Sequence, residues 1–190
     1  AANTASWGVD LGDFDGDGDL DVFISNFGAN AVFVNDGSGG FTDSGQTLGN
    51  HFSRNAAVGD VDNDGDLDVV VANDNGQSNY GTGENMLWLN NGSGVFTGQA
   101  FGGDRRSRDV LLGDLDGDGD LDAVVANSAD GNRVYLNNGA GSLGDSGQEM
   151  GSYNSQGIAF ADFDDDGDLD VIFANGGNAG EDDWRWHMYD

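Results

Sequence analysis

Carboxylates recur in this sequence at a spacing that suits a hard cation. Four nine-residue loops carry Asp at positions 1, 3, 5, 7 and 9 and Gly at position 6: DFDGDGDLD at 13–21, DVDNDGDLD at 60–68, DLDGDGDLD at 114–122 and DFDDDGDLD at 162–170. Oxygen ligands at alternate positions let a short segment curl around one ion, and the Gly permits the sharp turn. The pattern therefore predicts about four Ca²⁺ sites, one in each loop.

The Asp residues at the odd positions of these loops are the candidate metal residues. Positions 1, 3, 5 and 9 can offer carboxylate oxygens, and position 7 can offer its backbone carbonyl while its side chain points outward. The candidates are Asp13, Asp15, Asp17, Asp19, Asp21, Asp60, Asp62, Asp64, Asp66, Asp68, Asp114, Asp116, Asp118, Asp120, Asp122, Asp162, Asp164, Asp166, Asp168 and Asp170. The Leu at position 8 is expected to pack into the core in each loop, as Leu20, Leu67, Leu121 and Leu169.

Other cation-binding motifs fit the loops poorly. An EF-hand begins in the same way but needs Glu at position 12 and a following helix. Position 12 instead falls in an apolar run in all four loops, as Ile24, Val71, Val125 and Phe173. Zn²⁺ is disfavoured because the chain has no Cys and only two His, and Mg²⁺ prefers fewer protein ligands and more water. These exclusions favour Ca²⁺.

The charge of the chain is strongly negative, with 35 acidic and 6 basic residues and a net charge of −29. Such a charge argues against nucleic acid and anionic membrane surfaces as partners, because both would repel it. The four loops hold 21 of the 35 acidic residues, which argues against a merely salt-adapted surface. No apolar run reaches the 18 residues of a membrane-spanning helix.

The segments around the loops also repeat, and they read as strands. The loops begin 47, 54 and 48 residues apart, and an insertion at about 74–83 explains the longest spacing. A short apolar run precedes each loop and another follows it. A third apolar run then ends in Asn-Asp-Gly or Asn-Asn-Gly, which suits a tight hairpin, and a short fourth strand follows. Units of about 50 residues with four short strands are typical of propeller blades.

These units resemble the FG-GAP/VCBS-type repeats of integrin α-chain propellers and many bacterial surface proteins. The resemblance implies an all-β, β-propeller-like array of four blades, with a Ca²⁺ loop between the first and second strands of each blade. It also implies that positions 1, 3, 5 and 9 are ligands in all four loops. As one repeat domain, the blades would span about 5–49, 50–103, 104–151 and 152–190. Four blades could close, form part of a larger propeller, or assemble between chains.

Several residues outside the loops are expected to have structural roles. Trp7 and Trp88 are expected in the core, and the aromatic residues of Trp184-Arg185-Trp186-His187 are expected to pack in a final strand, with a sugar platform as the alternative. Pairing with Asp104 and Asp109 is expected for the basic cluster, which comprises Arg105, Arg106 and Arg108. The sequon Asn91-Gly92-Ser93 is explained by turn chemistry.

The predicted function is that of a non-catalytic, calcium-binding structural or adhesive module at the cell surface or outside the cell. A calcium-dependent, lectin-like carbohydrate-binding module is the alternative, and a non-catalytic part of a polysaccharide-active enzyme is a distant third. The fourth unit has no outer strand in the sequence, and an unpaired edge favours strand addition by another copy. The expected partners are therefore calcium, other copies of the chain, and glycans or cell-surface proteins.

Overall fold

The computed structural model describes residues 5–76, 82–151, 154–165, 167–176 and 186–189. These residues form fourteen strands and no helix. The strands are β1 (Ser6–Gly12), β2 (Asp21–Asn35), β3 (Phe41–Asp43), β4 (Leu48–Gly59), β5 (Asp68–Asn73), β6 (Glu84–Asn90), β7 (Phe96–Asp104), β8 (Ser107–Gly113), β9 (Asp122–Asn127), β10 (Asn132–Leu136), β11 (Gly144–Met150), β12 (Ser155–Ala161), β13 (Asp170–Asn175) and β14 (Trp186–Tyr189). The all-β prediction is confirmed for this part of the chain. The described residues contain no helix with the length and apolarity needed to cross a membrane.

The strands belong to three antiparallel sheets. A seven-stranded sheet has the order β1-β2-β4-β5-β6-β7, with β3 paired to β2; a four-stranded sheet has the order β11-β10-β9-β8; and a three-stranded sheet has the order β12-β13-β14. Each sheet segment built around one acidic loop is called a unit here. Unit 1 is β1–β3, unit 2 is β4–β7, unit 3 is β8–β11 and unit 4 is β12–β14.

Units 1 and 2 share the large sheet because β2 is long. The chain turns sharply within β2, where the Asn26 amide donates to Asn30 Oδ1 at 2.9 Å and Gly28 has a φ of 114°. This turn pairs with the start of β4, Phe27 opposite Phe52. The rest of β4 pairs with β5 inside unit 2.

The strands lie close to where the sequence predicts them, with one shift. The sequence predicts only a short fourth strand after each hairpin, but β7 runs from Phe96 to Asp104 and β11 from Gly144 to Met150. These outer strands are mostly exposed, and their polar and Gly-rich sequences give little hydrophobic pattern to mark them.

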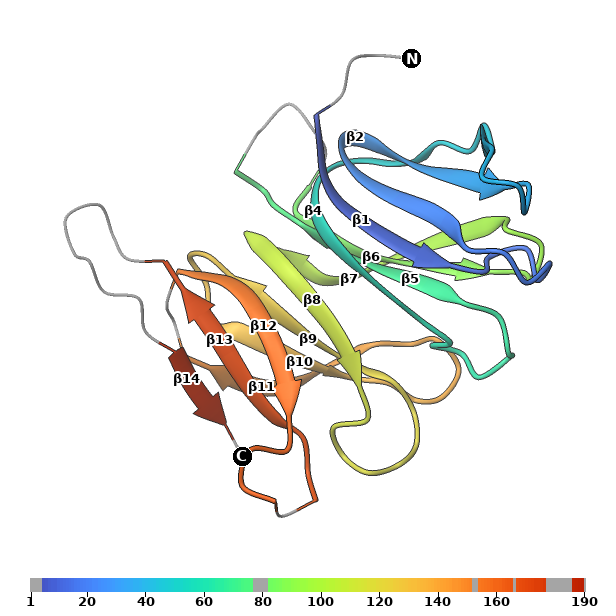
Figure 1. Cartoon of the computed structure of the whole chain (residues 1–190). Helices are drawn as coiled ribbons and strands as arrows, with labels where there is room; N and C mark the ends of the chain where they lie inside the picture. The colour runs from blue at the N-terminus through green and yellow to red at the C-terminus, as the bar shows by residue number, and fades with distance from the viewer. Residues whose placement is uncertain (1–4, 77–81, 152–153, 166, 177–185, 190) are drawn as a thin grey trace.

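The core consists of three clusters, each between two successive units. The first joins units 1 and 2 and includes Phe23 and Trp88, the second joins units 2 and 3 around Tyr135, and the third joins units 3 and 4 around Phe173. In Figure 1 the sheets follow one another in chain order, so the blue β1 and the red β14 lie on opposite sides of the molecule. Stacking of neighbouring units therefore buries the apolar faces.

Two predictions of burial, for the Trp residues and for the position-8 Leu residues, are wrong for some of these residues. Trp88 is in the core, but Trp7 is exposed. Among the position-8 leucines, Leu67 packs against the first core cluster, whereas Leu20 and Leu169 are exposed. Leu20 belongs to unit 1, and no described segment packs on the side of this unit away from unit 2. Trp7 contacts unit 2 instead, with 5.9 Å between its ring centroid and that of Phe52 and with the Arg54 guanidinium 4.6 Å from its ring, and it stays 56% exposed.

Glycine at the end of the first strand allows this stacking. Gly59 directly precedes an acidic loop, and a Cβ there would lie 2.7 Å from Leu121 Cδ1 and 3.2 Å from Leu112 Cδ1, both in unit 3. A Cβ on Gly113 would similarly lie 3.2 Å from Leu169 Cδ1 of unit 4. The missing side chain thus makes room for the apolar side chains of the next unit.

Candidate metal centres

Each acidic loop joins the first and second strands of its unit, and two left-handed residues shape it. Position 6 has φ between 92° and 100° in all four loops and is always Gly. Position 4 is also left-handed, as Gly16 at 75°, Asn63 at 59°, Gly117 at 77° and Asp165 at 63°. Gly, Asn and Asp are the residues that tolerate this conformation best, which explains their use at position 4.

The Asp at position 1 holds the loop in its curled form. The Asp13 carboxylate accepts backbone N–H groups from Gly16 at 2.9 Å, Asp17 at 3.1 Å and Gly18 at 2.9 Å. Asp114 accepts from Gly117 and Gly119 at 2.8 and 3.1 Å in the same way. These bonds bend the backbone around the position-1 carboxylate, so the other carboxylates converge beside it.

The Asp at position 9 is buried and ties the loop to the sheet. Asp68 Oδ2 accepts the Val61 N–H at 2.9 Å, and Asp68 Oδ1 accepts the Asn90 N–H at 2.9 Å. Asp21 and Asp122 make the equivalent pairs of bonds, to Phe14 and Asn35 and to Leu115 and Asn137. Position 9 therefore has a structural role in addition to any role as a ligand.

The structure brings three of the predicted carboxylates together in each loop. The oxygen atoms that each triad offers all lie within 4.8 Å of one another. The triads are Asp13, Asp15 and Asp17; Asp60, Asp62 and Asp68; Asp114, Asp116 and Asp122; and Asp162, Asp164 and Asp170. Positions 1 and 3 belong to all four triads, position 9 completes three of them, and position 5 completes the first.

The remaining predicted residues lie beside the triads. In the first three loops the position-5 carboxylate accepts the position-7 N–H, for example Asp64 Oδ1 from Asp66 at 3.0 Å. The position-7 side chains of Asp19, Asp66 and Asp120 are half-buried and do not point outward as predicted. They lie against the hairpin Gly of their own unit, where a Cβ on Gly37, Gly92 or Gly139 would collide with the carboxylate.

The donor set fits a hard divalent cation. Asp15 Oδ1 and Asp62 Oδ1 are buried oxygen atoms without a hydrogen-bond partner among the described residues. Burial, followed by repulsion from the next carboxylate in the loop, raises the pKa of both Asp15 and Asp62. Burial also raises the pKa of Asp68 to about 6, although the Asn90 and Val61 N–H groups oppose this. A bound cation would relieve these costs by pairing with the charged form.

The sequence identifies the Asn residues of the hairpins, but the hydrogen bonds of their side chains to the acidic loops were not predicted. Asn90 Nδ2 donates to Leu67 O at 3.2 Å in its own loop and to Phe14 O at 2.8 Å in the preceding loop. Asn137 makes the same pair of bonds, to Leu121 O at 3.1 Å and Val61 O at 2.7 Å. Each side chain thus connects two successive acidic loops. The sequence signal for this role is the recurrence of Asn at the end of the third strand, as Asn35, Asn90 and Asn137.

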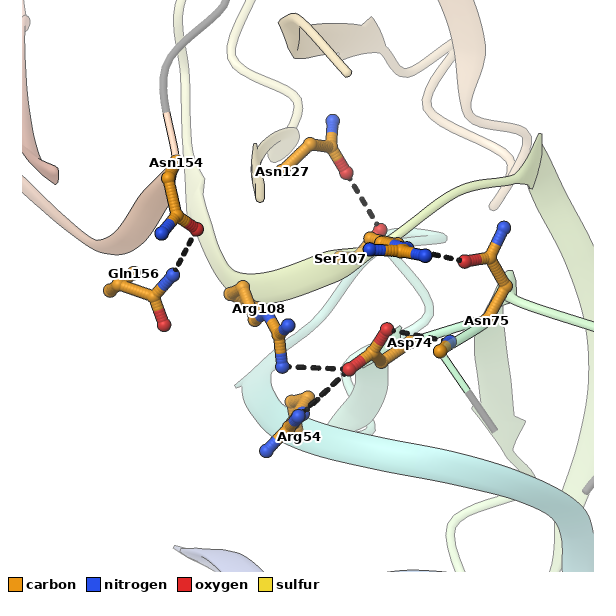
Figure 2. Close-up of polar contacts among 10 residues, drawn as sticks. Arg54, Asp74, Asn75, Ser107, Arg108, Asn127, Asn154 and Gln156 are labelled. Atoms are coloured by element: carbon orange, nitrogen blue, oxygen red, sulfur yellow. Dashed lines mark hydrogen bonds and ion pairs between the residues drawn. The ribbon is translucent and has the colours of Figure 1, made fainter. Parts of the chain in front are cut away.

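One residue of the basic cluster, Arg108, pairs with a different carboxylate from those predicted. The partner is Asp74, a buried residue just after β5, whose Oδ2 atom lies 2.8 Å from Arg54 Nη2 and 2.7 Å from Arg108 Nη1 (Figure 2). Arg106 donates instead to Asn75 Oδ1 at 3.3 Å. The prediction of pairing with Asp104 and Asp109 is therefore wrong for Arg108. Asp74 directly follows β5, where its N–H donates to Phe52 O at 2.9 Å, as Ser128 N–H donates to Arg106 O in unit 3. Trp184 and Arg185 of the predicted aromatic segment lie outside the described residues.

The described strands, with an acidic loop between the first and second strand of every unit, define an all-β repeat protein. The FG-GAP-like repeat family matches residues 13–71, 60–125 and 114–173. Each match runs from one acidic loop into the strand after the next loop. The chain therefore belongs to the FG-GAP-like repeat family, as the sequence predicts.

Comparison of structures places a lectin among the similar folds. The lectin is from Agrocybe aegerita and is described as recognising non-reducing terminal N-acetylglucosamine; its TM-score is 0.50 and its sequence identity 24%. The match covers 86% of this chain and 45% of the lectin, so this chain spans less than half of that protein. Among curated proteins, none matches the chain significantly.

Proposed function

We propose that the four acidic loops each bind one Ca²⁺ ion and that the chain is a non-catalytic, calcium-stabilised binding module. The observation that carries this proposal is the recurrence of one carboxylate triad at the same place in four units. The orphaned oxygen atoms of Asp15 and Asp62 support it, because a buried carboxylate oxygen needs a partner. When bound, Ca²⁺ supplies charge neutralisation and oxygen coordination at the triads.

We further propose that the four units are blades of a propeller-like array, with the bounds 5–49, 50–103, 104–151 and 152–190 given above. The sheets do not form a closed ring among the described residues. Consecutive clusters of apolar residues between the units support the blade arrangement. Calcium loops at the rim would stiffen each blade where its first strand turns into its second.

The place of action proposed is outside the cell or on its surface. Modules of this kind bind Ca²⁺ at about 10⁻⁴ to 10⁻³ M, a range that only extracellular calcium saturates. We infer a structural or adhesive role because the chain is strongly acidic and the described residues show no catalytic constellation. His51, for example, has its Nδ1 atom 3.0 Å from Thr82 O, a backbone contact.

Isothermal titration of the metal-free chain with CaCl₂ tests the metal proposal. About four ions per chain are expected, with dissociation constants of about 10⁻⁴ to 10⁻³ M. Titration with MgCl₂ is the matched control and should give weaker binding, since Mg²⁺ gives up its water reluctantly. Absence of calcium binding up to about 10 mM would contradict the proposal, because that concentration exceeds the expected range.

Glycan binding is the second candidate function. The fold similarity to a lectin favours it, together with the exposed Trp7 ring, over which the Arg54 guanidinium lies at 4.6 Å. Exposed aromatic rings can stack on the apolar faces of sugars. A glycan array with the calcium-loaded chain tests this candidate. Binding lost in a Trp7→Ala variant would support it, and an empty array would leave the structural role.

A further inference from the structure

The carboxylate triads of units 1 and 2 are connected by one side chain, that of Asn90 at the end of β6. The Asn90 backbone N–H donates to Asp68 Oδ1 at 2.9 Å, and its Nδ2 atom donates to the Phe14 carbonyl at 2.8 Å. Asp68 belongs to the triad of loop 2. Phe14 stands between Asp13 and Asp15, which belong to the triad of loop 1. A single residue thus holds the backbone or a carboxylate of two sites.

Asn137 makes the same connection between loops 2 and 3. Its backbone N–H donates to Asp122 Oδ1 at 2.8 Å, and its Nδ2 atom donates to the Val61 carbonyl at 2.7 Å. Asp122 belongs to the triad of loop 3, and Val61 stands between Asp60 and Asp62 of the triad of loop 2. Loops 1, 2 and 3 are therefore joined in series by two Asn side chains.

These connections are buried. Asn90 is 5% and Asn137 is 7% exposed, and Phe14 and Val61, whose carbonyls they hold, are 1% and 0% exposed. A buried carbonyl that loses its donor costs free energy, because water does not replace the lost hydrogen bond. A displacement of one loop is therefore transmitted to the next loop.

The hairpin of each following unit also packs on the position-3 carboxylate of the loop before it. A Cβ on Gly94 of unit 2 would lie 3.7 Å from Asp15 Cβ, and a Cβ on Gly141 of unit 3 would lie 3.1 Å from Asp62 Cβ. Asp15 and Asp62 are the residues whose Oδ1 atoms are buried without a hydrogen-bond partner among the described residues. The surroundings of one triad thus depend on the position of the next unit.

We propose that Asn90 and Asn137 are positioning residues that couple calcium binding at loops 1, 2 and 3, so that occupation of one loop raises the affinity of the loops next to it. This inference rests on the proposed calcium binding and adds a regulation of the same sites. It concerns interfaces inside the chain, between units 1 and 2 and between units 2 and 3.

The coupling follows from what each Asn holds. Without a cation the carboxylates of a loop repel one another, which loosens the loop. When loop 2 is occupied, Asp68 is fixed and fixes the Asn90 backbone, and the Asn90 side chain then holds the peptide between Asp13 and Asp15. Ordering loop 1 for an ion of its own therefore costs less conformational entropy. The effect is equal in the reverse direction, since coupling between two binding sites is reciprocal.

Repulsion between two bound cations acts against this coupling. At about 0.15 M salt its range is limited to about 8 Å. The repulsion does not pass through the Asn side chains, so it remains when one of them is removed. Substitution of the Asn residues therefore separates the two contributions.

Titration with CaCl₂ followed by nuclear magnetic resonance reads the loops separately. The position-6 N–H of each loop donates to the position-1 carboxylate, as Gly18 does to Asp13 at 2.9 Å, and so reports on metal binding at that carboxylate. The amide signals of Gly18, Gly65 and Gly119 give one calcium midpoint for each of the three loops. Asp62→Asn is used to empty loop 2, which a silent Gly65 signal verifies.

We expect Asp62→Asn to raise the calcium midpoints of both Gly18 and Gly119 by about twofold to tenfold, because a typical coupling of about 5- to 150-fold is shared between two sites. When Asn90→Ala is added, the Gly18 midpoint should no longer respond to Asp62→Asn, whereas the Gly119 midpoint still should. Asn137→Ala should have the mirror effect. A role of Asn90 confined to its own loop would not produce this pattern.

Asn91→Ala is the matched control for Asn90→Ala. Asn91 is exposed on the same hairpin, and its Oδ1 atom accepts the Ser93 N–H, which belongs to that hairpin. This substitution should leave the responses of both neighbouring loops intact. The amide spectrum in EDTA shows whether each variant folds, and Asn137→Ala gives the same test if Asn90→Ala does not fold.

Two results would overturn the proposal. The midpoints of Gly18 and Gly119 could be unchanged by Asp62→Asn, a result that requires no substitution of Asn. Alternatively, the Gly18 midpoint could still respond to Asp62→Asn in the presence of Asn90→Ala, which would mean that Asn90 does not carry the coupling. If no amide signal of the unmodified chain responds to calcium, the calcium proposal itself fails, and this outcome is distinct from binding without coupling.

Discussion

The Ser53 hydroxyl donates a 2.8 Å hydrogen bond to Asn73 Oδ1, and both residues are fully buried. The same pair joins the first and second strands of every unit, always 20 residues apart. The other pairs are Ser6–Asn26 at 2.7 Å, Ser107–Asn127 at 2.9 Å and Ser155–Asn175 at 2.6 Å. Each pair closes the end of the strand pair that lies away from the acidic loop.

Removal of this hydroxyl should destabilise the fold. Ser53→Ala leaves Asn73 Oδ1 buried without its partner, which costs about 1–3 kcal/mol of unfolding free energy. Urea denaturation followed by circular dichroism measures the loss. Ser38→Ala, at an exposed hairpin position, is the control and should change the stability by less than about 0.5 kcal/mol. Equal effects of the two substitutions would argue against a role for the Ser–Asn pair.

Calcium should raise the melting temperature strongly. At ten times the dissociation constant each site adds about 1.4 kcal/mol, so four sites add about 5–6 kcal/mol. For a chain of this size that corresponds to about 10–20 °C in melting temperature. Differential scanning calorimetry with excess CaCl₂ and with excess EDTA measures the shift. An unchanged melting temperature would mean that the loops do not stabilise the fold through calcium.

Two substitutions in one loop should separate metal binding from structure. Asp62 has an oxygen atom without a hydrogen-bond partner, so Asp62→Asn should remove about one ion from the titration and leave the stability in EDTA nearly unchanged. Asp68 accepts two backbone N–H groups, so Asp68→Asn should cost about 1–3 kcal/mol even in EDTA. Urea denaturation in EDTA compares the two. Equal stability of the variants would contradict the structural role of position 9.

Asp10 should make the fold less stable as the pH rises. Burial, and then the nearby Asp109, raise the pKa of Asp10 from 3.8 to about 6. Between these values the folded protein holds a proton that the unfolded chain releases, so the unfolding free energy falls with increasing pH. Asp10→Asn removes this dependence and should add about 1 kcal/mol at pH 7, allowing for the partial exposure of the group.

Thermal melts at several pH values between about 4 and 7 test this expectation. The difference in melting temperature between Asp10→Asn and the unmodified chain should grow across that window. Ser38→Ala, at an exposed position without a titratable group, is the control. A constant difference between Asp10→Asn and the unmodified chain would show that Asp10 does not titrate in the window.

The buried Asp74 should be more important than an exposed ion pair. It accepts both Arg54 and Arg108 at one oxygen atom (Figure 2), so Asp74→Asn leaves two guanidinium groups without their counter-ion. We expect a loss of about 2–4 kcal/mol in unfolding free energy, measured by urea denaturation. Glu149→Gln breaks the 3.0 Å pair of Arg133 with a largely exposed carboxylate, and should cost at most about 1 kcal/mol. A smaller loss for Asp74→Asn than for Glu149→Gln would contradict this ranking.

The loops and hairpins were predictable because each depends on residues that are close together in the sequence. The acidic loops depend on Asp and Gly within nine residues, and the hairpins depend on Asn and Gly within three. The triads at 13–17 and 60–68 accordingly contain predicted residues alone. The outer strand β7 was predicted poorly, because its exposed, Gly-rich sequence has little hydrophobic alternation.

The sequence by itself determined that this chain is an all-β repeat protein with four acidic loops, because the loops and hairpins are encoded locally and recur four and three times. Only the tertiary structure decided which apolar residues are covered. Leu20 is exposed although the equivalent Leu67 packs against the first core cluster, since burial depends on whether another unit stacks on that side. It likewise decided that Arg108 pairs with Asp74, which lies 34 residues earlier in the chain, because stacking of units 2 and 3 brings β8 beside the end of β5.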